Sequence, residues 1–120
     1  MTLTALQEIG SGGEKSMFSI GMTYNLKPDC YAGYKKAHDE LWPEVAGSMS
    51  DNGVNMIIFR HGDQLFLTAT APTEANWNMS REHPKLAEWI EFMTKFLVAD
   101  DTGEIIFHEM EEAFVFGDFS

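Results

Sequence analysis

The stretch VNMIIFRHGDQLFLTATA, residues 54–71, contains two runs that are rich in β-branched, aromatic and other apolar residues. Runs of this kind, at 54–60 and 64–71, are typical of β-strands. The link between them, His61-Gly62-Asp63, has the length of a hairpin connection. The sequence therefore predicts a pair of antiparallel strands in the middle of the chain.

Helical patterns flank this hairpin on both sides. Before it, Pro28 and Asp29 open a helix with Asp29 as the expected N-cap, and this helix is broken or restarted at Pro43 and continues to Asn52. After it, a helical region opens at residues 72–73, and its main segment begins at Pro84 and extends to about residue 97. The apolar stripe of this segment consists of Leu86, Trp89, Met93 and Phe96.

Two further strands lie outside the helices. Residues 17–26 alternate between apolar and small polar side chains, and a last strand is expected within 105–116. The order β-α-β-β-α-β predicts an α+β fold of the ferredoxin-like type, in which an antiparallel sheet carries both helices on one face. Its other face must then meet a ligand, a second subunit or both. We expect a single domain at 16–120, preceded by a flexible leader at 1–15.

The charge of the chain limits its partners. Nineteen acidic residues oppose eight basic ones, and the net charge is −11. Such a surface repels phosphate backbones and anionic lipids, so neither nucleic acid nor a membrane is expected as a partner. A neutral ligand fits this charge better, and an anionic substrate would need a local basic pocket. The one cysteine, Cys30, excludes an intrachain disulfide and favours a reducing, cytoplasmic location.

The most distinctive chemistry lies in the first helix. Tyr34 and His38 are four residues apart, so their side chains project from the same face of the helix. A phenol and an imidazole can together bind a polyhydroxylated ligand and move its protons near neutral pH. Trp89 can supply a flat platform for the apolar face of a sugar. The alternative, that these residues and Trp42 and Trp77 only pack the core, stays open.

Other candidates are weaker. His61 lies in a turn, His83 precedes a helix, and His108 faces either water or the site. No pair of histidines has the spacing of a metal site, and no cofactor-binding motif occurs, so neither a metal nor a cofactor is expected. In an alternating strand Glu111 and Glu112 point in opposite directions, so one of them is a candidate to face inward and orient a hydroxyl or His38.

The stretch YKKAHDELWPE, residues 34–44, resembles the signature of the L-rhamnose mutarotase family, a tyrosine and a histidine four apart followed by Trp-Pro-Glu. The similarity continues over about 17–116. It implies a homodimeric α/β barrel in which His38 is the proton donor and Tyr34 and Trp89 contact the sugar. Two positions depart from the family pattern, because Met56 and Ile90 stand where aromatic residues are usual.

The resemblance implies an isomerase that interconverts the α and β anomers of L-rhamnose or of a related neutral deoxyhexose, without a cofactor. Ring opening needs one proton removed from the anomeric hydroxyl and one delivered to the ring oxygen. The hypothesis is that His38 protonates the ring oxygen, while Tyr34 or an inward glutamate handles the other proton. The rival interpretations are a cofactor-free monooxygenase of the same fold and a sugar-binding module without activity.

Overall fold

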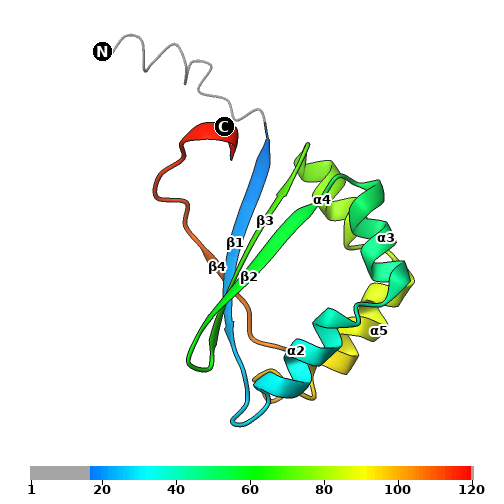
Figure 1. The fold of residues 1–120 in the computed structure, drawn as a ribbon, viewed down its shortest axis with the longest axis vertical. Helices are drawn as coiled ribbons and strands as arrows, with labels where there is room; N and C mark the ends of the chain where they lie inside the picture. The colour runs from blue at the N-terminus through cyan, green and yellow to red at the C-terminus, as the bar shows by residue number, and fades with distance from the viewer. Residues whose placement is uncertain (1–16, 120) are drawn as a thin grey trace.

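The computed structural model describes residues 17–119 (Figure 1). The leader predicted at 1–15 lies outside the described residues. The elements, in chain order, are β1 (Phe18–Asn25), α2 (Tyr31–Asp39), α3 (Pro43–Asp51), β2 (Asn55–His61), β3 (Gln64–Ala71), α4 (Glu74–Ser80), α5 (Pro84–Met93), β4 (His108–Met110) and the short 3-10 helix η1 (Gly117–Phe119).

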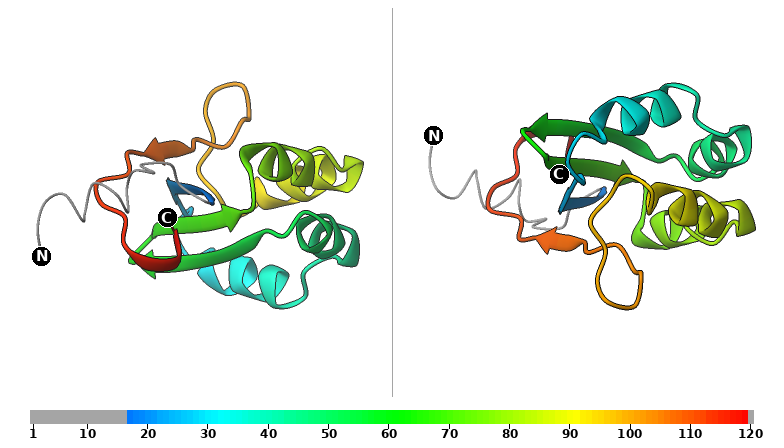
Figure 2. Two further views of the ribbon diagram at one scale, coloured as in Figure 1. Left: turned by 90° about the horizontal axis from the view of Figure 1, so that it is seen from above. Right: turned by 90° about the horizontal axis from the view of Figure 1, so that it is seen from below.

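The four strands form one antiparallel sheet in the order β2-β3-β1-β4. This order confirms the predicted ferredoxin-like fold, with the hairpin β2–β3 at one side and the two outer strands of the sequence paired with each other. The helices cover one face of the sheet only (Figure 1). Seen from either end, α2 and α3 form one row and α4 and α5 a second row beside it (Figure 2).

The register of the strands decides which side chains meet the helices. Met22 of β1 is paired with Leu67 of β3, and Leu67 is paired with Ile58 of β2. Because successive side chains in a strand alternate between faces, these three residues share the covered face with Tyr24 and Leu65. The alternating pattern in the sequence therefore separates the side chains that face the helices from those on the open face of the sheet.

The helices begin and end partly as expected. A break at Pro43 separates α2 from α3, as predicted. The prediction of Asp29 as N-cap is wrong, because Asp29 has a φ of 62° and the N-cap is Cys30, which makes no side-chain capping bond. At α4, by contrast, Thr73 Oγ1 accepts a hydrogen bond from the backbone N–H of Asn76 at 3.1 Å. Helix α5 ends at Met93, four residues before the predicted end.

One glycine allows the first helix to approach the segment after α5. A Cβ at Gly33 would lie 2.6 Å from Cε1 of Phe96, which is closer than two carbon atoms can pack. This close approach seats α2 against the end of α5. The contact brings the first helix, with its tyrosine and histidine, over the covered face of the sheet.

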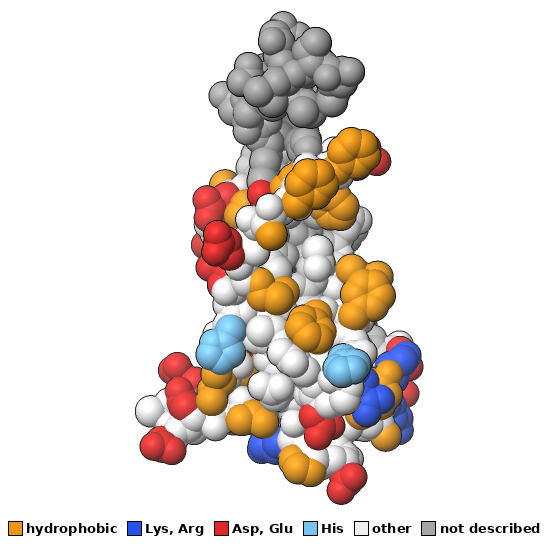
Figure 3. Space-filling view, turned by 90° about the vertical axis from the view of Figure 1, so that its left-hand side faces the viewer, with side chains coloured by type: hydrophobic (Ala, Val, Ile, Leu, Met, Phe, Trp, Pro, Cys, Tyr) orange, Lys and Arg blue, Asp and Glu red, His pale blue; other side chains and the backbone are white. Residues whose placement is uncertain are grey.

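The last strand is shorter than the expected range of 105–116. Only His108–Met110 pair with β1, and residues 111–116 form no strand. Side chains of β2 and of this C-terminal segment stay exposed on or beside the open face, including Ile57 (52%), Phe59 (60%) and Phe114 (83%). Figure 3 views this face, where apolar side chains are spread over the sheet and beside the C-terminus. No helix among residues 17–119 is long and apolar enough to cross a membrane.

Candidate active site

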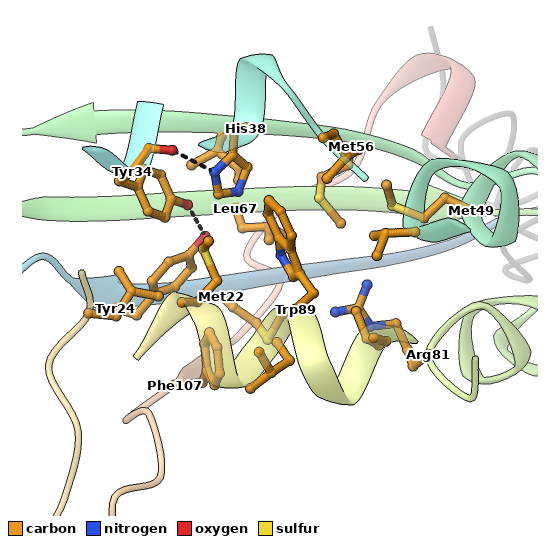
Figure 4. A pocket seen from close by; sticks show the side chains of 17 residues that line it. Met22, Tyr24, Tyr34, His38, Met49, Met56, Leu67, Arg81, Trp89 and Phe107 are labelled. Carbon is orange, nitrogen blue, oxygen red and sulfur yellow. Dashed lines mark hydrogen bonds between the residues drawn. The ribbon is translucent and has the colours of Figure 1, made fainter. Parts of the chain in front are cut away.

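A cavity of about 150 Å³ lies between the covered face of the sheet and the helices (Figure 4). Most of its wall is aliphatic, aromatic or thioether, and four methionines contribute to it: Met22, Met49, Met56 and Met93. The side chains with strongly polar groups are Tyr24, Tyr34, His38 and Arg81. A pocket of this composition suits a small ligand with one apolar face and a few hydroxyl groups.

His38 has a fixed orientation in this cavity. Its Nδ1 lies 2.9 Å from the backbone carbonyl oxygen of Tyr34, one turn earlier on α2. Because a carbonyl only accepts, this contact assigns the proton of the neutral ring to Nδ1 and leaves a lone pair on Nε2. Burial lowers the pKa of His38, while the bond to the Tyr34 carbonyl opposes that shift. The neutral ring, with Nε2 able to accept a proton, is therefore the dominant form at neutral pH.

Tyr34 lies directly against His38, with 4.2 Å between the ring centroids. Its hydroxyl is 3.0 Å from the hydroxyl of Tyr24 on β1, and both side chains are buried. Burial, followed by the charge and hydrogen bond of the neighbouring Tyr24, raises the pKa of Tyr34 far above its ordinary value. Tyr34 therefore keeps its proton and acts as a hydrogen-bonding group. The sequence did not identify Tyr24 as a site residue. Tyr24 lies two residues after Met22, however, and residues two apart in a strand share the same face.

Trp89 combines both of the roles that the sequence left open. The residue is 5% exposed and belongs to the core, yet it also lines the cavity. Its ring centroid is 5.2 Å from that of His38, with the planes at 77°. Trp42 packs edge-on against Trp89 at 5.3 Å and stacks on Phe92. Because Trp42 does not line the cavity, the structural interpretation holds for it.

Met56 and Ile90, where the resemblance leads us to expect aromatic residues, are both in the wall of the cavity. Met56 reaches it from β2, and Ile90 from α5, directly after Trp89. A flexible thioether and a branched aliphatic chain there leave a wall without the flat surface that two further rings would provide. These positions are therefore placed to alter which sugar fits.

The remaining sequence candidates lie elsewhere. His108 pairs with Thr23, whose side chain points to the open face, and His83 caps α5 by accepting the Lys85 N–H at 3.0 Å. The prediction that Glu111 or Glu112 faces the cavity is wrong, because both line a separate hollow that contains open-face residues of β1. Within residues 17–119 no group of three or more His, Cys, Asp or Glu side chains is placed to hold a metal ion.

Arg81 is the second cavity residue that the sequence did not indicate. It follows α4 directly, and in Figure 4 its guanidinium points into the cavity on the side of Trp89 opposite His38. A single arginine at a helix end carries no pattern from which such a position could be predicted. The cavity thus has a histidine–tyrosine end and a cationic end.

Comparisons with known proteins identify the family that this chain resembles. A family model described as L-rhamnose mutarotase matches residues 19–116. An L-rhamnose mutarotase of Tolumonas auensis is 27% identical over 93 residues, which cover 75% of this chain and 89% of that protein. The crystal structure of an L-rhamnose mutarotase from Formosa agariphila superposes with a TM-score of 0.70 at 22% identity, covering 83% of this chain and 99% of that one.

The fold extends to a second class of protein. A Nitrosomonas europaea protein assigned to the antibiotic biosynthesis monooxygenases superposes with a TM-score of 0.62 at 12% identity. The overlap covers 87% of this chain and 97% of the other. At this identity the likeness concerns the fold alone, since one fold serves many functions.

Proposed function

This chain belongs to the L-rhamnose mutarotase family, and from this premise we propose that it interconverts the α and β anomers of L-rhamnose or a related neutral deoxyhexose in the cavity beside His38. One observation carries the proposal. The unprotonated Nε2 of a neutral, oriented imidazole shares a small cavity with a tyrosine hydroxyl and a tryptophan ring. Acid–base opening of a sugar ring requires a group of this kind, which can accept and return a proton beside the bound sugar.

His38 performs the proton transfers. Its Nε2 takes the proton of the anomeric hydroxyl, and the electron pair of that O–H bond forms the C1=O double bond. The bond from C1 to the ring oxygen breaks, and the imidazolium returns the proton to that oxygen, which becomes the hydroxyl on C5. Rotation about C1–C2 and the reverse steps close the other anomer. No atom is gained or lost, and the reaction needs no metal or cofactor.

This route modifies the earlier hypothesis about the second proton. No carboxylate is among the residues that line the cavity, so an inward glutamate does not serve. Burial raises the pKa of Tyr34, so its phenol does not give up its proton readily and is poorly suited to proton transfer. The anomeric and ring oxygens share one carbon atom, so a single imidazole can reach each in turn. Tyr34 then donates a hydrogen bond to the sugar, and Trp89 supports its apolar face.

Saturation-transfer NMR of L-rhamnose and L-fucose tests the proposal. The intact protein should accelerate exchange between anomers, and His38→Ala should lower the acceleration by about 10²–10⁴-fold, the usual contribution of general acid–base catalysis. His61→Ala, on the uncovered side of the hairpin, is the matched control and should keep the full rate. Full activity in His38→Ala would remove this histidine from the mechanism.

Two further measurements, calorimetry and oxygen uptake, separate the rival functions. A binding module would show calorimetric affinity for a sugar without faster exchange, and a monooxygenase would consume oxygen with quinol substrates. If no aldose is exchanged faster, the mutarotase proposal fails.

We also propose a homodimer in which two open sheet faces pack together. The support is the exposed apolar surface of β2 and of the C-terminal segment, where Phe59 and Phe114 are 60% and 83% exposed. Large exposed apolar surfaces of this kind favour burial against a partner. Light scattering should give twice the chain mass. A cytoplasmic location is part of the proposal, because Cys30 is a free thiol.

A further inference from the structure

The backbone of Arg81 is fixed by the end of α4. Its N–H donates to the carbonyl of Asn78 at 3.1 Å. The preceding residue, Ser80, is 2% exposed, and its carbonyl accepts a hydrogen bond from Ser48 Oγ on α3 at 3.0 Å. These bonds tie Arg81 to two helices. Its side chain therefore starts from a rigid point at the wall of the cavity.

Within the part of the chain that the structure describes, the guanidinium has no anionic partner. Among residues 17–119, Arg81 takes part in no ion pair and no side-chain hydrogen bond, and its one described contact is with the Trp77 ring, 5.0 Å from Cζ to the centroid. Burial lowers the pKa of Arg81, and the only group that opposes this shift is the phenol of Tyr24, across the cavity. A partly buried cation without a counter-charge is costly to the fold, so its retention in an apolar wall indicates a ligand that supplies the charge.

The position of this cation relative to His38 defines what it can bind. In Figure 4, Trp89 stands between His38 and Arg81. In a pyranose both C1 and C5 are bonded to the ring oxygen, so a sugar whose ring oxygen faces His38 carries its C5 substituent on the rim beside that oxygen. From this rim the substituent can extend past Trp89 toward Arg81. In a 6-deoxyhexose this substituent is a methyl group, and in a hexuronate it is a carboxylate.

Building on the proposed function, we propose that Arg81 binds the C5 carboxylate of an aldohexuronate, so that the His38 cavity also interconverts the anomers of acidic sugars. A guanidinium presents two parallel N–H groups, which match the two oxygens of a carboxylate. The acidic surface of the chain repels anions at long range, since the net charge is −11. Arg81 is the local basic group that an anionic substrate of this protein requires.

The experiment compares each uronate with the uncharged hexose that differs from it only at C6, and uses L-rhamnose as the neutral reference. Saturation-transfer NMR measures the kcat/KM of exchange for D-galacturonate, D-glucuronate and L-rhamnose, with D-galactose and D-glucose as the uncharged matches of the two uronates. The intact protein should accelerate exchange of at least one uronate more than that of its uncharged match. Arg81→Met should lower the ratio of uronate to L-rhamnose kcat/KM by about 10- to 100-fold, mainly through a higher KM, because a charge-assisted bidentate contact is lost.

Two further variants keep the comparison interpretable. Arg81→Lys retains the charge without the paired N–H groups and should give an intermediate ratio. Lys36→Met removes one positive charge from an exposed position on α2 and should leave the ratio unchanged. Thermal unfolding identifies any variant that does not fold, and Arg81→Lys then carries the test.

The outcomes distinguish this inference from the proposed function. If L-rhamnose is exchanged faster and no uronate is, the inference is wrong and the proposed function stands. An equal loss for both kinds of sugar in Arg81→Met also overturns the inference, because Arg81 would then contact a hydroxyl common to both. If no sugar is exchanged faster, the proposed function and the interconversion of uronates both fail, and calorimetry decides only whether Arg81 binds a carboxylate. In that case uronate binding that Arg81→Met weakens supports the carboxylate site, and unchanged or absent binding refutes it.

Discussion

The two faces of the sheet are built from the same strands and both carry apolar side chains, yet only the covered face brings an imidazole, two phenols and a guanidinium together in one cavity. On the covered face, Tyr24 is buried against Tyr34, and the cavity beside them contains an imidazole and a guanidinium. On the open face, Ile57 and Phe59 alternate with Met56 and Ile58 along β2 and are left exposed. Apolar character alone therefore does not distinguish a site from a surface for association.

The difference lies in what each face is packed against. Helices α2 and α5 place their polar side chains over the sheet at fixed positions, because each side chain is tied to its own helix or to a neighbouring one. Among residues 17–119, no helix layer covers the open face. Preorganised polar groups inside an apolar wall are what catalysis requires, whereas an open apolar face favours burial against another surface. If the two faces have separate roles, a change on one face should leave the role of the other face intact.

The largest effect on stability should come from truncating a ring on the covered face. Trp89→Ala removes a core side chain that is 5% exposed and leaves a cavity. The expected loss in the free energy of unfolding is about 3–5 kcal/mol. Phe59→Ala on the open face, measured on the monomer at low protein concentration, should cost far less. Urea unfolding of both variants provides the test, and equal losses would contradict the division between the faces.

The second prediction concerns association. Phe59→Glu places a charge on the proposed dimer surface, and a two-fold axis brings the two copies of that surface together. Light scattering at micromolar concentration should show a shift from dimer to monomer, while Phe59→Leu remains dimeric. Anomer exchange per chain should be unchanged, since Phe59 does not line the cavity. A loss of exchange in the monomer would show that the open face contributes to the site.

The third prediction separates the two tyrosines of the covered face. Tyr24→Phe leaves the buried Tyr34 hydroxyl without its partner at 3.0 Å, which should cost about 1–3 kcal/mol of stability. Tyr34→Phe should cost a similar amount and should also raise the KM for the sugar, because it removes the hydrogen bond that we propose Tyr34 donates to the substrate. The stability of both variants is measured by urea unfolding, and KM by saturation-transfer NMR. An equal rise in KM for both would assign the sugar contact to the pair.

The smallest effect is the dependence on pH. Burial lowers the pKa of His38, so Nε2 stays able to accept a proton at pH values below 6.5. The enzymatic exchange rate should rise with pH to a half-maximum below 6.5 and stay flat above it. Between the folded pKa and 6.5 the unfolded chain binds more protons, so stability should also rise with pH there. NMR titration of the His38 ring, beside the rate profile, checks both, and a midpoint above 6.5 would contradict this assignment.

Much of the fold could be predicted from local patterns. The strand predicted at residues 64–71 has the same limits as β3 in the structure. Pro43 separates α2 from α3 as expected. The true N-cap of α2, Cys30, could not be predicted. The residue expected to be the cap, Asp29, has a left-handed backbone that follows from the turn before α2. The last strand was expected anywhere within 105–116, since apolar residues continue past Met110 while the pairing with β1 stops there. Pairing depends on the neighbouring strand, which a local pattern does not contain.

The site was predictable where spacing carries the information. Tyr34 and His38 lie four residues apart on one helix, so their proximity follows from helical geometry. Tyr24 and Arg81 come from other elements, and only the folded chain brings them to the same cavity. Glu111 and Glu112 were misassigned because alternation was extended beyond the end of β4. Contacts between distant segments, rather than residue types, are the information that the sequence pattern lacks.

The four methionines in the cavity wall have a consequence for the range of sugars accepted. Thioether chains are unbranched and polarisable, and they rotate about three bonds at little cost, so such a wall can reshape itself around ligands of different outline. Met56, which reaches the cavity from β2, contributes directly to this adaptability. Oxidation of any of these sulfur atoms to a sulfoxide would make part of the apolar lining polar. Breadth of recognition and sensitivity to peroxide would then have a common origin.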